Sequence, residues 1–438
     1  AAAPALPRAI AIAHPDLPGE AAPFRGLCGA AVAWKVACAV ASAWFGRERV
    51  PESVRRRLVE LLPLVALGTI ADVMSLEDEN RIFAATGLRG LASTTIPGLA
   101  ELVRVESRGR RPDAESIGFR LAPMLNACGR LGHAAEALEL LTSATGRRAS
   151  QIVRSLAALN DERRRLERAC VEEAAADAER LGLVNDDRRA IVLSNPRWHE
   201  GVVGIACSRL VERFSRPVVL LQEKEGLAKG SGRSVPAVHL LDAMRRCESI
   251  RFHRLGGHAM AIGLQIDAAS VPALREEFVE QVNRRATAAE LLPELEIDGR
   301  LRLADLSAGA VRELERLQPF GRGNPRPRFL LEKVVLTAPA RAMGQGDHAE
   351  FWVADAGSPR RAQRVVWWNG ATPSRALPVG VELEVVADAR FDSFRGVEEL
   401  VLTAGDARYP DAAVPEPRQA ATAAASPEPE SLLRPGRG

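Results

Sequence analysis

Apolar residues recur at helical spacing in the first part of the chain. The Ala-rich stretches GAAVAWKVACAVASAWF and VRRRLVELLPLVALGTIADV lie within residues 26–91, and GFRLAPMLNACGRLGHAAEALELL marks a second helical unit at 116–141. One long helix is predicted over 149–183, because no Pro or Gly interrupts it before Gly182. Its charges alternate in sign at short range, which is typical of a solvated helix that joins two bodies.

A strand–helix–strand pattern begins near residue 187. A β-type run at 190–193 is followed by the loop SNPRWHEG, the amphipathic segment VVGIACSRLVERF and the β-type run RPVVLL. This order and spacing predict a βαβ unit with two parallel strands. The segment continues through KGSGRS, a helix near 240–246, the sequence RLGGHAMAIGLQI and a helix near 271–284.

From about residue 294, short β-type runs alternate with Gly/Pro turns. The runs are RFLLEKVVLTA, AEFWVAD, RAQRVVWW, VELEVVADARFD and EELVLTA, and together they predict a small barrel or sandwich. Trp367 and Trp368 are adjacent, so in a strand one side chain faces the interior and the other faces solvent. The residues after Pro410 are rich in Ala, Pro, Glu and Ser, which predicts disorder.

Composition limits the classes of protein that fit. A chain of 438 residues is long enough for two to four domains, and its 47% hydrophobic and 26% charged residues are typical of a soluble protein. The sequence contains no apolar run long enough for a membrane span and no signal-peptide pattern at its start. Six scattered cysteines without a C-x-x-C pair argue against a zinc site and favour a reduced, cytoplasmic protein.

A carboxylate follows a buried apolar run in the segment GTIADV. Asp72 stands beside small residues at the end of that element, where it is well placed to bind a hard cation. The alternative is that Asp72 only caps the following turn, and the spacing taken alone favours that alternative.

Two further motifs place polar side chains beside glycine. In LNACGRL, Asn126 and Arg130 bracket a glycine and suit a tight turn that presents a guanidinium group to a phosphate. A surface arginine in a helix-capping turn is the alternative. In WHEGVVG, His199 stands before a helix N-terminus, where backbone N–H groups and the helix dipole favour anions. It either contacts a substrate or holds the loop in place.

Small residues and cations also stand together in KGSGRS. The backbone can approach an anion closely there, while Ser231, Arg233 and Ser234 donate to it, although a plain Gly/Ser turn has the same composition. In GGH, two glycines place His258 directly after Gly257 where the backbone passes near another group. A lone histidine after a turn is usually structural.

Taken in order, these motifs resemble the RecJ branch of the DHH phosphoesterase superfamily. GTIADVMSLEDENR, LAPMLNACGRLG, RWHEGVVGIACSRLVERFSRPVVLL, KGSGRS and GGHAMAIG follow one another as in that family. LNDERRRLE resembles its connector helix, and QPFGRGNPRPRFLL resembles the entry to its OB-type domain. The resemblance implies an α/β fold with these parts: the remainder of a DHH core at 1–142, a connector helix at 143–184, a DHHA1 nucleic-acid-binding domain at 185–286, an OB-like β-barrel at 287–409 and a disordered tail at 410–438.

The resemblance also implies roles for the residues in the matching motifs. Asp72 would be a catalytic residue and a ligand of Mn²⁺ or Mg²⁺. The residues expected to contact DNA or its phosphates, including the 5′ end, are Asn126, Arg130, His199, Ser231, Arg233, Ser234, Gly257 and His258. Phe394, Arg395 and Trp352 could stack on bases, although core packing is the commoner role of such aromatic residues.

The implied activity is metal-dependent 5′-to-3′ degradation of single-stranded DNA to mononucleotides, in DNA repair and recombination. Single-strand-binding protein and a helicase are the partners that the family suggests. The sequence departs from the family because it contains neither an Asp-x-Asp pair nor an Asp-His-His run. Hydrolysis by two metals needs several ligands that hold the ions about 3.5–4 Å apart. We therefore expect an N-terminally truncated, RecJ-type chain whose metal site is incomplete and which is inactive alone.

Two alternatives stay open at this point. One is a DHH phosphodiesterase that acts on short oligonucleotides or cyclic dinucleotides, although such enzymes usually lack an OB-like extension. The other is a non-catalytic nucleic-acid-binding protein that has lost its metal site. The sequence upstream of residue 1 would distinguish them, because an enzyme needs the two missing motifs there.

Overall fold

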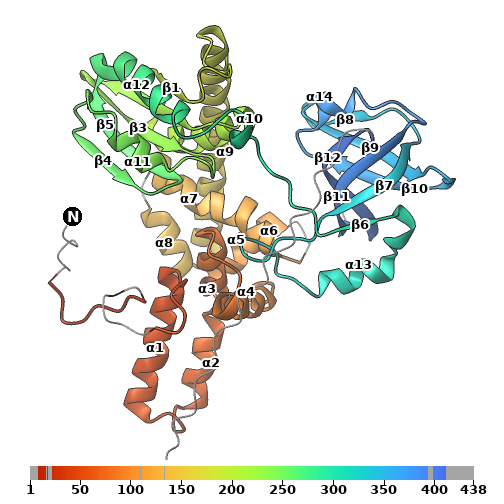
Figure 1. Ribbon diagram of the computed structural model, residues 1–438. Coiled ribbons are helices and arrows are strands. Elements are labelled where there is room, and N and C mark those ends of the chain that lie inside the picture. The colour runs from red at the N-terminus through yellow and green to blue at the C-terminus, as the bar shows by residue number, and fades with distance from the viewer. Residues whose placement is uncertain are drawn as a thin grey trace, which may run out of the picture. The chain divides into compact units, whose positions relative to one another are not determined.

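The computed structural model describes residues 8–15, 17, 22–107, 111–132, 134–392 and 398–410 (Figure 1). The chain divides into two compact units, a larger one of residues 1–294 with 318–325 and a smaller one of residues 295–317 with 326–438. None of the helices in the described ranges is long and apolar enough to cross a membrane.

Helices form the first part of the larger unit, as the apolar spacing predicts. They are α1 (Gly29–Phe45), α2 (Glu52–Glu60), α3 (Leu62–Ala71), α4 (Asp78–Leu91), α5 (Pro97–Ser107), α6 (Ala114–Ser116), the π-helical turn η1 (Ile117–Leu121), α7 (Ala122–Leu131), α8 (Ala135–Thr142) and α9 (Gly146–Arg180). Leu99, Leu102 and Leu156 are fully buried where α5 packs against α9. Burial of such side chains contributes about 1.5–3 kcal/mol each to stability.

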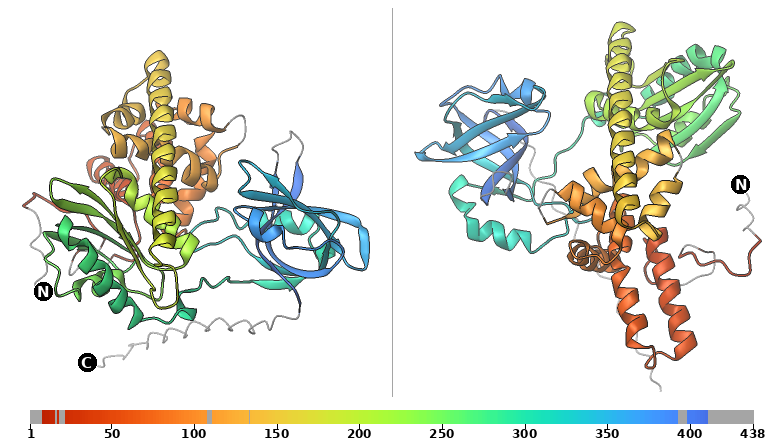
Figure 2. Two further views of the ribbon diagram at one scale, coloured as in Figure 1. Left: turned by 90° about the horizontal axis from the view of Figure 1, so that it is seen from above. Right: turned by 180° about the vertical axis from the view of Figure 1, so that it is seen from behind.

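The long helix α9 exists as predicted, but it is not solvated on all sides. Ile152 and Leu156 lie in the core shared with α5 and α7. Further along, Ala174 and Ala178 lie in a second core that α9 forms with the β-sheet. The charged residues that suggest a solvated helix alternate with an apolar stripe at helical spacing, and that stripe is buried. One helix therefore joins the helical part to the sheet by packing against both (Figure 2).

The second part of the larger unit is a five-stranded sheet of order β1-β2-β3-β5-β4. Its elements are β1 (Ile191–Ser194), α10 (Glu200–Phe214), β2 (Val218–Lys224), β3 (Leu227–Arg233), α11 (Leu240–Arg245), β4 (Arg254–Gly257), β5 (Ala261–Asp267) and α12 (Val271–Asn283). β1 and β2 are parallel with α10 between them, so the predicted βαβ unit is confirmed. Side chains alternate between two cores: Val218 and Leu220 face α9 and α10, whereas Val219 and Leu221 face α11 and α12.

Two segments whose composition also suits a turn are regular structure instead. KGSGRS lies mostly within β3, which pairs with β2 on one side and β5 on the other. Its polar residues alternate with glycine at the period of a strand, so this pattern fits a strand as well as a turn. LNACGR lies inside α7, because Met124, Ala127 and Cys128 are buried at helical spacing. The prediction of a tight turn at this motif is wrong.

The smaller unit is a closed β-barrel, as predicted. Its strands are β6 (Gly299–Leu301), β7 (Phe329–Leu336), β8 (Arg341–Met343), β9 (His348–Asp355), β10 (Ser358–Trp367), β11 (Glu382–Asp392) and β12 (Glu399–Arg408), and its helices include α13 (Ala308–Glu315) and α14 (Ala371–Ser374). The order β7-β11-β12-β10-β9 closes because β9 pairs back to β7. Trp367 is 7% exposed and Trp368 is 51% exposed, which confirms that adjacent tryptophans face opposite sides of the strand.

Candidate phosphate-binding site

Several of the residues that the sequence motifs mark as DNA contacts lie close to the first turn of α10. His199 is the N-cap of this helix, and its Nδ1 accepts a hydrogen bond from the Gly201 N–H at 3.0 Å. The preceding Trp198 is 3% exposed and donates from Nε1 to Glu173 of α9 at 3.1 Å. Trp198 is therefore a packing residue, and it fixes the loop that positions the N-terminus of α10.

Two side chains of β3 lie against this helix. A Cβ atom at Gly204 of α10 would lie 3.2 Å from the Arg233 Nη2 atom and 3.4 Å from the Ser231 hydroxyl oxygen. Glycine at this position therefore allows both side chains to approach the helix. Arg233 also donates from Nη1 to the carbonyl of Gly232 at 2.9 Å, which holds its guanidinium group at the end of β3.

Arg130 reaches the same turn from α7. Its Nη1 donates to the Gly201 carbonyl at 3.2 Å. Burial lowers the pKa of the Arg130 guanidinium, and the nearby Arg233 lowers it further, whereas Glu167 raises it. The structure thus brings together Arg130 and Arg233, which are far apart in the sequence. Two guanidinium groups beside a helix N-terminus form a site suited to a phosphate.

The β4–β5 hairpin borders this site on the next strand. Arg233 of β3 is opposite Ala261 of β5, and the His258 N–H donates to the carbonyl of that same Ala261 at 2.8 Å. Gly257 has a φ of 141°, and a Cβ atom there would lie 2.2 Å from the Ala261 oxygen, so only glycine fits. His258 is exposed, and its Nδ1 accepts a hydrogen bond from the Met260 N–H.

A row of small residues crosses the sheet beside Ser231. Ser231 is paired with Gly263 of β5, and Gly263 is paired with Gly256 of β4, so all three lie on one face. A Cβ atom built on Gly256 or Gly263 would meet nothing within 4 Å. This glycine strip, Gly256 and Gly263, leaves bare backbone next to the two arginines.

Other predicted contact residues lie differently. Asn126 is exposed on α7, one turn before Arg130, and can face a ligand that Arg130 binds. Ser234 is 5% exposed, and its hydroxyl donates to the Val238 carbonyl at 2.7 Å, so it stabilises the loop after β3. Ser234 therefore faces the loop and lies outside the candidate phosphate-binding site, which we define as Arg130, Ser231, Arg233 and the first turn of α10.

The predicted metal ligand Asp72 is the C-cap of α3. Its side chain is exposed, and its N–H donates to the Gly68 carbonyl at 3.0 Å. The segment Gln318–Pro325, which the sequence suggests as the barrel's entry, packs beside it: the Leu76 N–H donates to the Arg322 carbonyl at 2.6 Å. In the described ranges, no group of three or more His, Cys, Asp or Glu residues could hold a metal ion. The described residues therefore do not form a two-metal centre by themselves.

Three residues of the smaller unit are predicted to stack on bases. Phe394 and Arg395, predicted to stack on bases, lie outside the described residues. Trp352 is half-buried in β9. Trp368, which no sequence motif marks as a contact residue, is half-exposed and forms an edge-to-face contact with His348 at 4.9 Å between ring centroids.

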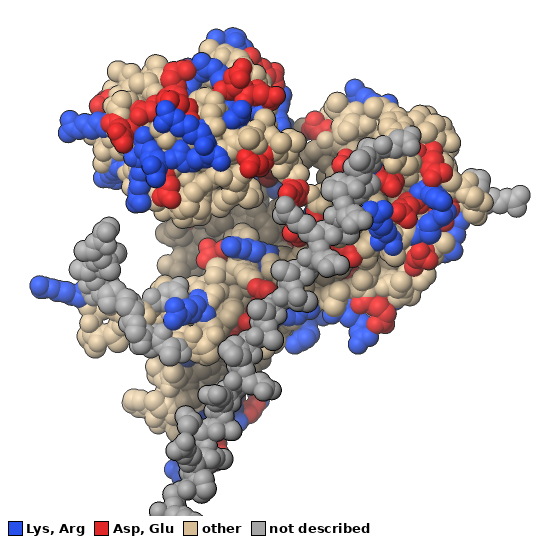
Figure 3. All heavy atoms as spheres, viewed as in Figure 1, with Lys and Arg blue, Asp and Glu red and all other residues tan. Residues whose placement is uncertain are grey.

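Basic side chains also gather on the part of the larger unit that holds α11 and α12 (Figure 3). Arg245, Arg246 and Arg284 are exposed there, and burial together with the neighbouring Arg246 lowers the pKa of Arg285. The sheet separates these helices from α10, so these arginines do not belong to the phosphate-binding site. Their positive field would still favour the approach of a polyanion.

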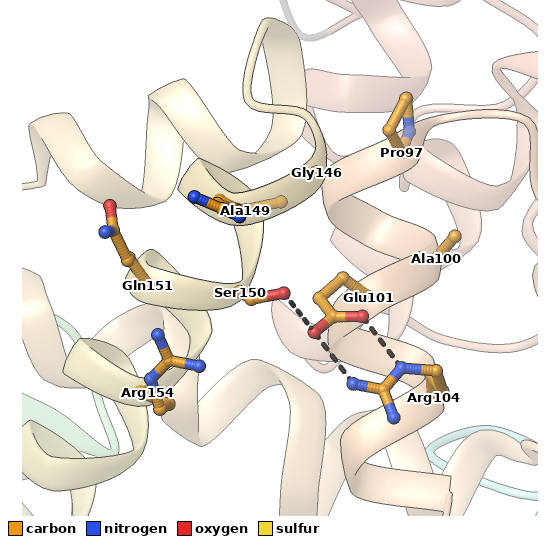
Figure 4. A pocket seen from close by; sticks show the side chains of 10 residues that line it. Pro97, Ala100, Glu101, Arg104, Gly146, Ala149, Ser150, Gln151 and Arg154 are labelled. Carbon is orange, nitrogen blue, oxygen red and sulfur yellow. Dashed lines mark hydrogen bonds and ion pairs between the residues drawn. The ribbon is translucent and has the colours of Figure 1, made fainter.

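A cavity of about 650 Å³ lies between α5 and α9, away from every predicted site residue (Figure 4). Within it Glu101 accepts two hydrogen bonds from Arg104, both at 2.8 Å, and one from the Ser150 hydroxyl at 2.7 Å. These hydrogen bonds, with the charges of Arg104 and Arg154, lower the pKa of Glu101 to about 2. The carboxylate therefore joins α5 to α9, which indicates a structural role.

This ion pair gives a prediction for stability. Because the folded-state pKa of Glu101 lies below its ordinary value, its contribution is present at neutral pH and is lost as pH falls from 4.5 toward 2. We expect Glu101→Gln to lower the free energy of unfolding by about 1 kcal/mol at pH 7. Urea titrations at several pH values would show this difference shrinking in acid. A difference that is constant from about pH 7 to about pH 3 would contradict the assignment.

Two domain families match the chain: residues 187–286 match the DHHA1 domain, and residues 297–406 match the RecJ OB domain. The chain is 34% identical over 408 residues to the single-stranded-DNA-specific exonuclease RecJ of Bacillus subtilis, covering 92% of this chain and 49% of that protein. It is 34% identical over 336 residues to RecJ of Escherichia coli, covering 74% of this chain and 58% of that protein.

A solved structure agrees with these matches. The crystal structure of RecJ in complex with Mn²⁺ from Thermus thermophilus superimposes with a TM-score of 0.68 at 32% identity, covering 82% of this chain and 52% of that one. The same protein has also been solved with Mg²⁺, at the same TM-score and 33% identity. The chain thus spans about half the length of the relatives that it matches.

Proposed function

This chain is a RecJ-type protein, and we propose that it binds single-stranded DNA at the phosphate-binding site formed by Arg130, Ser231, Arg233 and α10. The observation that carries this proposal is the convergence of two guanidinium groups and a serine hydroxyl on one helix N-terminus. Guanidinium groups bind phosphate oxygens through paired hydrogen bonds, and the helix dipole favours the same charge.

The bound DNA strand would lie over the glycine strip of the β-sheet. A phosphate held by Arg130 and Arg233 brings its sugar and base next to Gly263 and Gly256, where no side chain blocks the backbone. Exposed His258 stands at the end of the same strip. Contacts of this kind depend on the sugar-phosphate backbone, so binding should be independent of sequence and should weaken as salt rises.

We extend the proposal to the activity of the relatives, which are named single-stranded-DNA-specific exonucleases. The chain would provide the part that holds DNA in a 5′-to-3′ exonuclease, and Asp72 would add one carboxylate to a site for Mn²⁺ or Mg²⁺. Bound divalent ions would supply a hydroxide nucleophile and charge neutralisation. The described residues lack the other ligands, so the hydrolytic step itself requires groups beyond them.

The cellular setting is part of the same proposal. An enzyme that removes nucleotides from single strands fits DNA repair and recombination. Single-strand-binding protein and a helicase are the partners that would supply its substrate, because one coats single strands and the other produces them. The names of the relatives support the single-stranded substrate.

A single substitution in the glycine strip tests whether the bound DNA lies over it. Gly263→Val adds a β-branched side chain to a strand position with open space above it, so the fold should tolerate the change. We expect the affinity for a 5′-phosphorylated oligothymidylate to fall about ten-fold, measured by fluorescence anisotropy. The melting temperature serves as the control for folding. Unchanged affinity in a folded variant would remove the strip from the binding surface.

A further inference from the structure

A buried carboxylate on α9 holds two arginines beside the phosphate-binding site. Glu167 accepts a hydrogen bond from Arg163 Nη1 at Oε2 (3.0 Å) and one from Arg209 Nε at Oε1 (3.3 Å). The side chains of Arg163 and Glu167 are 11% and 12% exposed, so this pair is shielded from water. Since Arg209 belongs to α10, the carboxylate also ties α9 to the helix whose first turn forms the site.

Positive charge exceeds negative charge around this carboxylate. Burial lowers the pKa of the Arg163 guanidinium, Glu167 opposes that change, and Arg130 and Arg209 are among the arginines that lower it further. Arg130 in turn interacts with Arg233. Arg163, Arg130 and Arg209 therefore interact with Glu167, and Arg209 also pairs with Glu212 at 3.1 Å. An anionic ligand such as the phosphate of a DNA strand would offset this excess.

Two polar atoms on the same part of α9 are buried and have no hydrogen-bond partner in the described part of the chain. They are the Nε atom of Arg163 and the Oδ1 atom of Asn160, which stand one turn apart. Asn160 is only 4% exposed. Buried polar atoms are nearly always paired in folded proteins, so the unpaired Nε–H donor of Arg163 beside the proposed binding site points to a missing acceptor.

We propose that Arg163 is a further DNA-contacting residue and that Glu167 is the positioning residue that holds it. Arg163 uses Nη1 to bind Glu167 and keeps its Nε–H as a donor to the ligand. The ligand is a second phosphate of the strand, next to the one held by Arg130 and Arg233. This inference rests on the proposed function of the phosphate-binding site.

The test must separate a contact with DNA from a purely structural ion pair. Replacing both members of a buried ion pair with apolar residues of similar size often leaves stability unchanged, whereas removing one member is destabilising. The double variant Arg163→Met/Glu167→Leu is therefore expected to fold with a melting temperature near that of the parent chain, because Arg209 keeps its ion pair with Glu212 at 3.1 Å. We expect its affinity for a 5′-phosphorylated oligothymidylate to fall about ten-fold. The slope of log affinity against log salt should fall by about 0.7, the value for one phosphate.

The matched control lies on the other side of the same helix. Arg165 and Glu162 form an exposed ion pair on α9, with Arg165 68% exposed, and Arg165→Met/Glu162→Leu should leave affinity and salt slope unchanged. A folded Arg163→Met/Glu167→Leu variant with unchanged binding would overturn the inference. If Arg233→Ala still weakens binding in that case, only the inference fails. If Arg233→Ala also has no effect, the proposed function fails.

A conservative variant covers the case in which the double variant does not fold. Arg163→Lys keeps a cation for Glu167 but removes the Nε–H and the planar guanidinium group. Weaker binding at an unchanged melting temperature would support the contact with DNA. Unchanged binding would assign the pair to structure alone.

Discussion

Arg233→Ala weakens the binding of single-stranded DNA by about 10- to 150-fold, because hydrogen bonds to charged groups contribute about 1.5–3 kcal/mol each. Arg233 lies against Gly204 of α10 and beside Arg130, so its removal takes away one of the two guanidinium groups of the site. The double variant Arg130→Ala/Arg233→Ala should weaken binding more than Arg233→Ala alone, because it removes both guanidinium groups of the site. Fluorescence anisotropy with an oligothymidylate at several salt concentrations measures both affinity and slope.

The slope of log affinity against log salt gives a stricter criterion than affinity alone. Each phosphate of a single strand that the protein no longer neutralises lowers this slope by about 0.7, so the double variant, which loses the phosphate that Arg130 and Arg233 share, should show one such step. Arg213→Ala is the matched control, because Arg213 also belongs to α10 but pairs with Glu179 at 2.8 Å. If Arg213→Ala and Arg233→Ala lowered the affinity and the salt slope equally, DNA would be bound by non-specific electrostatic attraction to arginines and not at a defined site.

The second large effect concerns hydrolysis. The chain alone is expected to degrade single-stranded DNA with Mn²⁺ at least about 10³-fold more slowly than a full-length relative, because one carboxylate cannot hold two ions. In a chain that also carries the Asp-x-Asp and Asp-His-His motifs, Asp72→Ala should abolish Mn²⁺-dependent release of mononucleotides. The same change should leave DNA binding without metal nearly unaltered, since Asp72 lies outside the phosphate-binding site.

Two results would contradict this role of Asp72. Near-normal turnover of Asp72→Ala would remove it from the metal site. Metal-dependent turnover by the present chain would show that other residues hold the ions. Glu79→Ala is a suitable control, because that carboxylate follows Asp72 closely in the sequence but pairs with Lys35 at 2.6 Å.

Much of the fold follows from local patterns in the sequence. In the βαβ unit and the barrel strands, apolar residues recur at the spacing typical of a helix or a strand. Turn residues mark where each element ends, so the positions of these elements could be predicted. KGSGRS and LNACGR could not, because glycine and small polar residues are compatible with turn, strand and helix. Pairing with β2 and β5 makes the first a strand, and burial of Cys128 continues the second as a helix.

The candidate site was only partly accessible from the sequence. Motif order points to Arg130 and Arg233 but supplies no reason for them to meet; the contact between α7 and α10 at Gly201 brings them together. Arg163 and Glu167 lie among alternating charges on α9 that suggest a solvated face. Their burial depends on how α9 packs against other helices, and that packing cannot be predicted from the charge pattern of α9 alone.

Hydrogen–deuterium exchange with and without an oligothymidylate tests the central claim most directly, because it compares all parts of the chain at once. We predict that DNA slows exchange in the first turn of α10, in β3 and in the β4–β5 hairpin, with no change around the cavity between α5 and α9. Slower exchange confined to the barrel strands, with the α10 and β3 amides unaffected, would contradict the proposed phosphate-binding site.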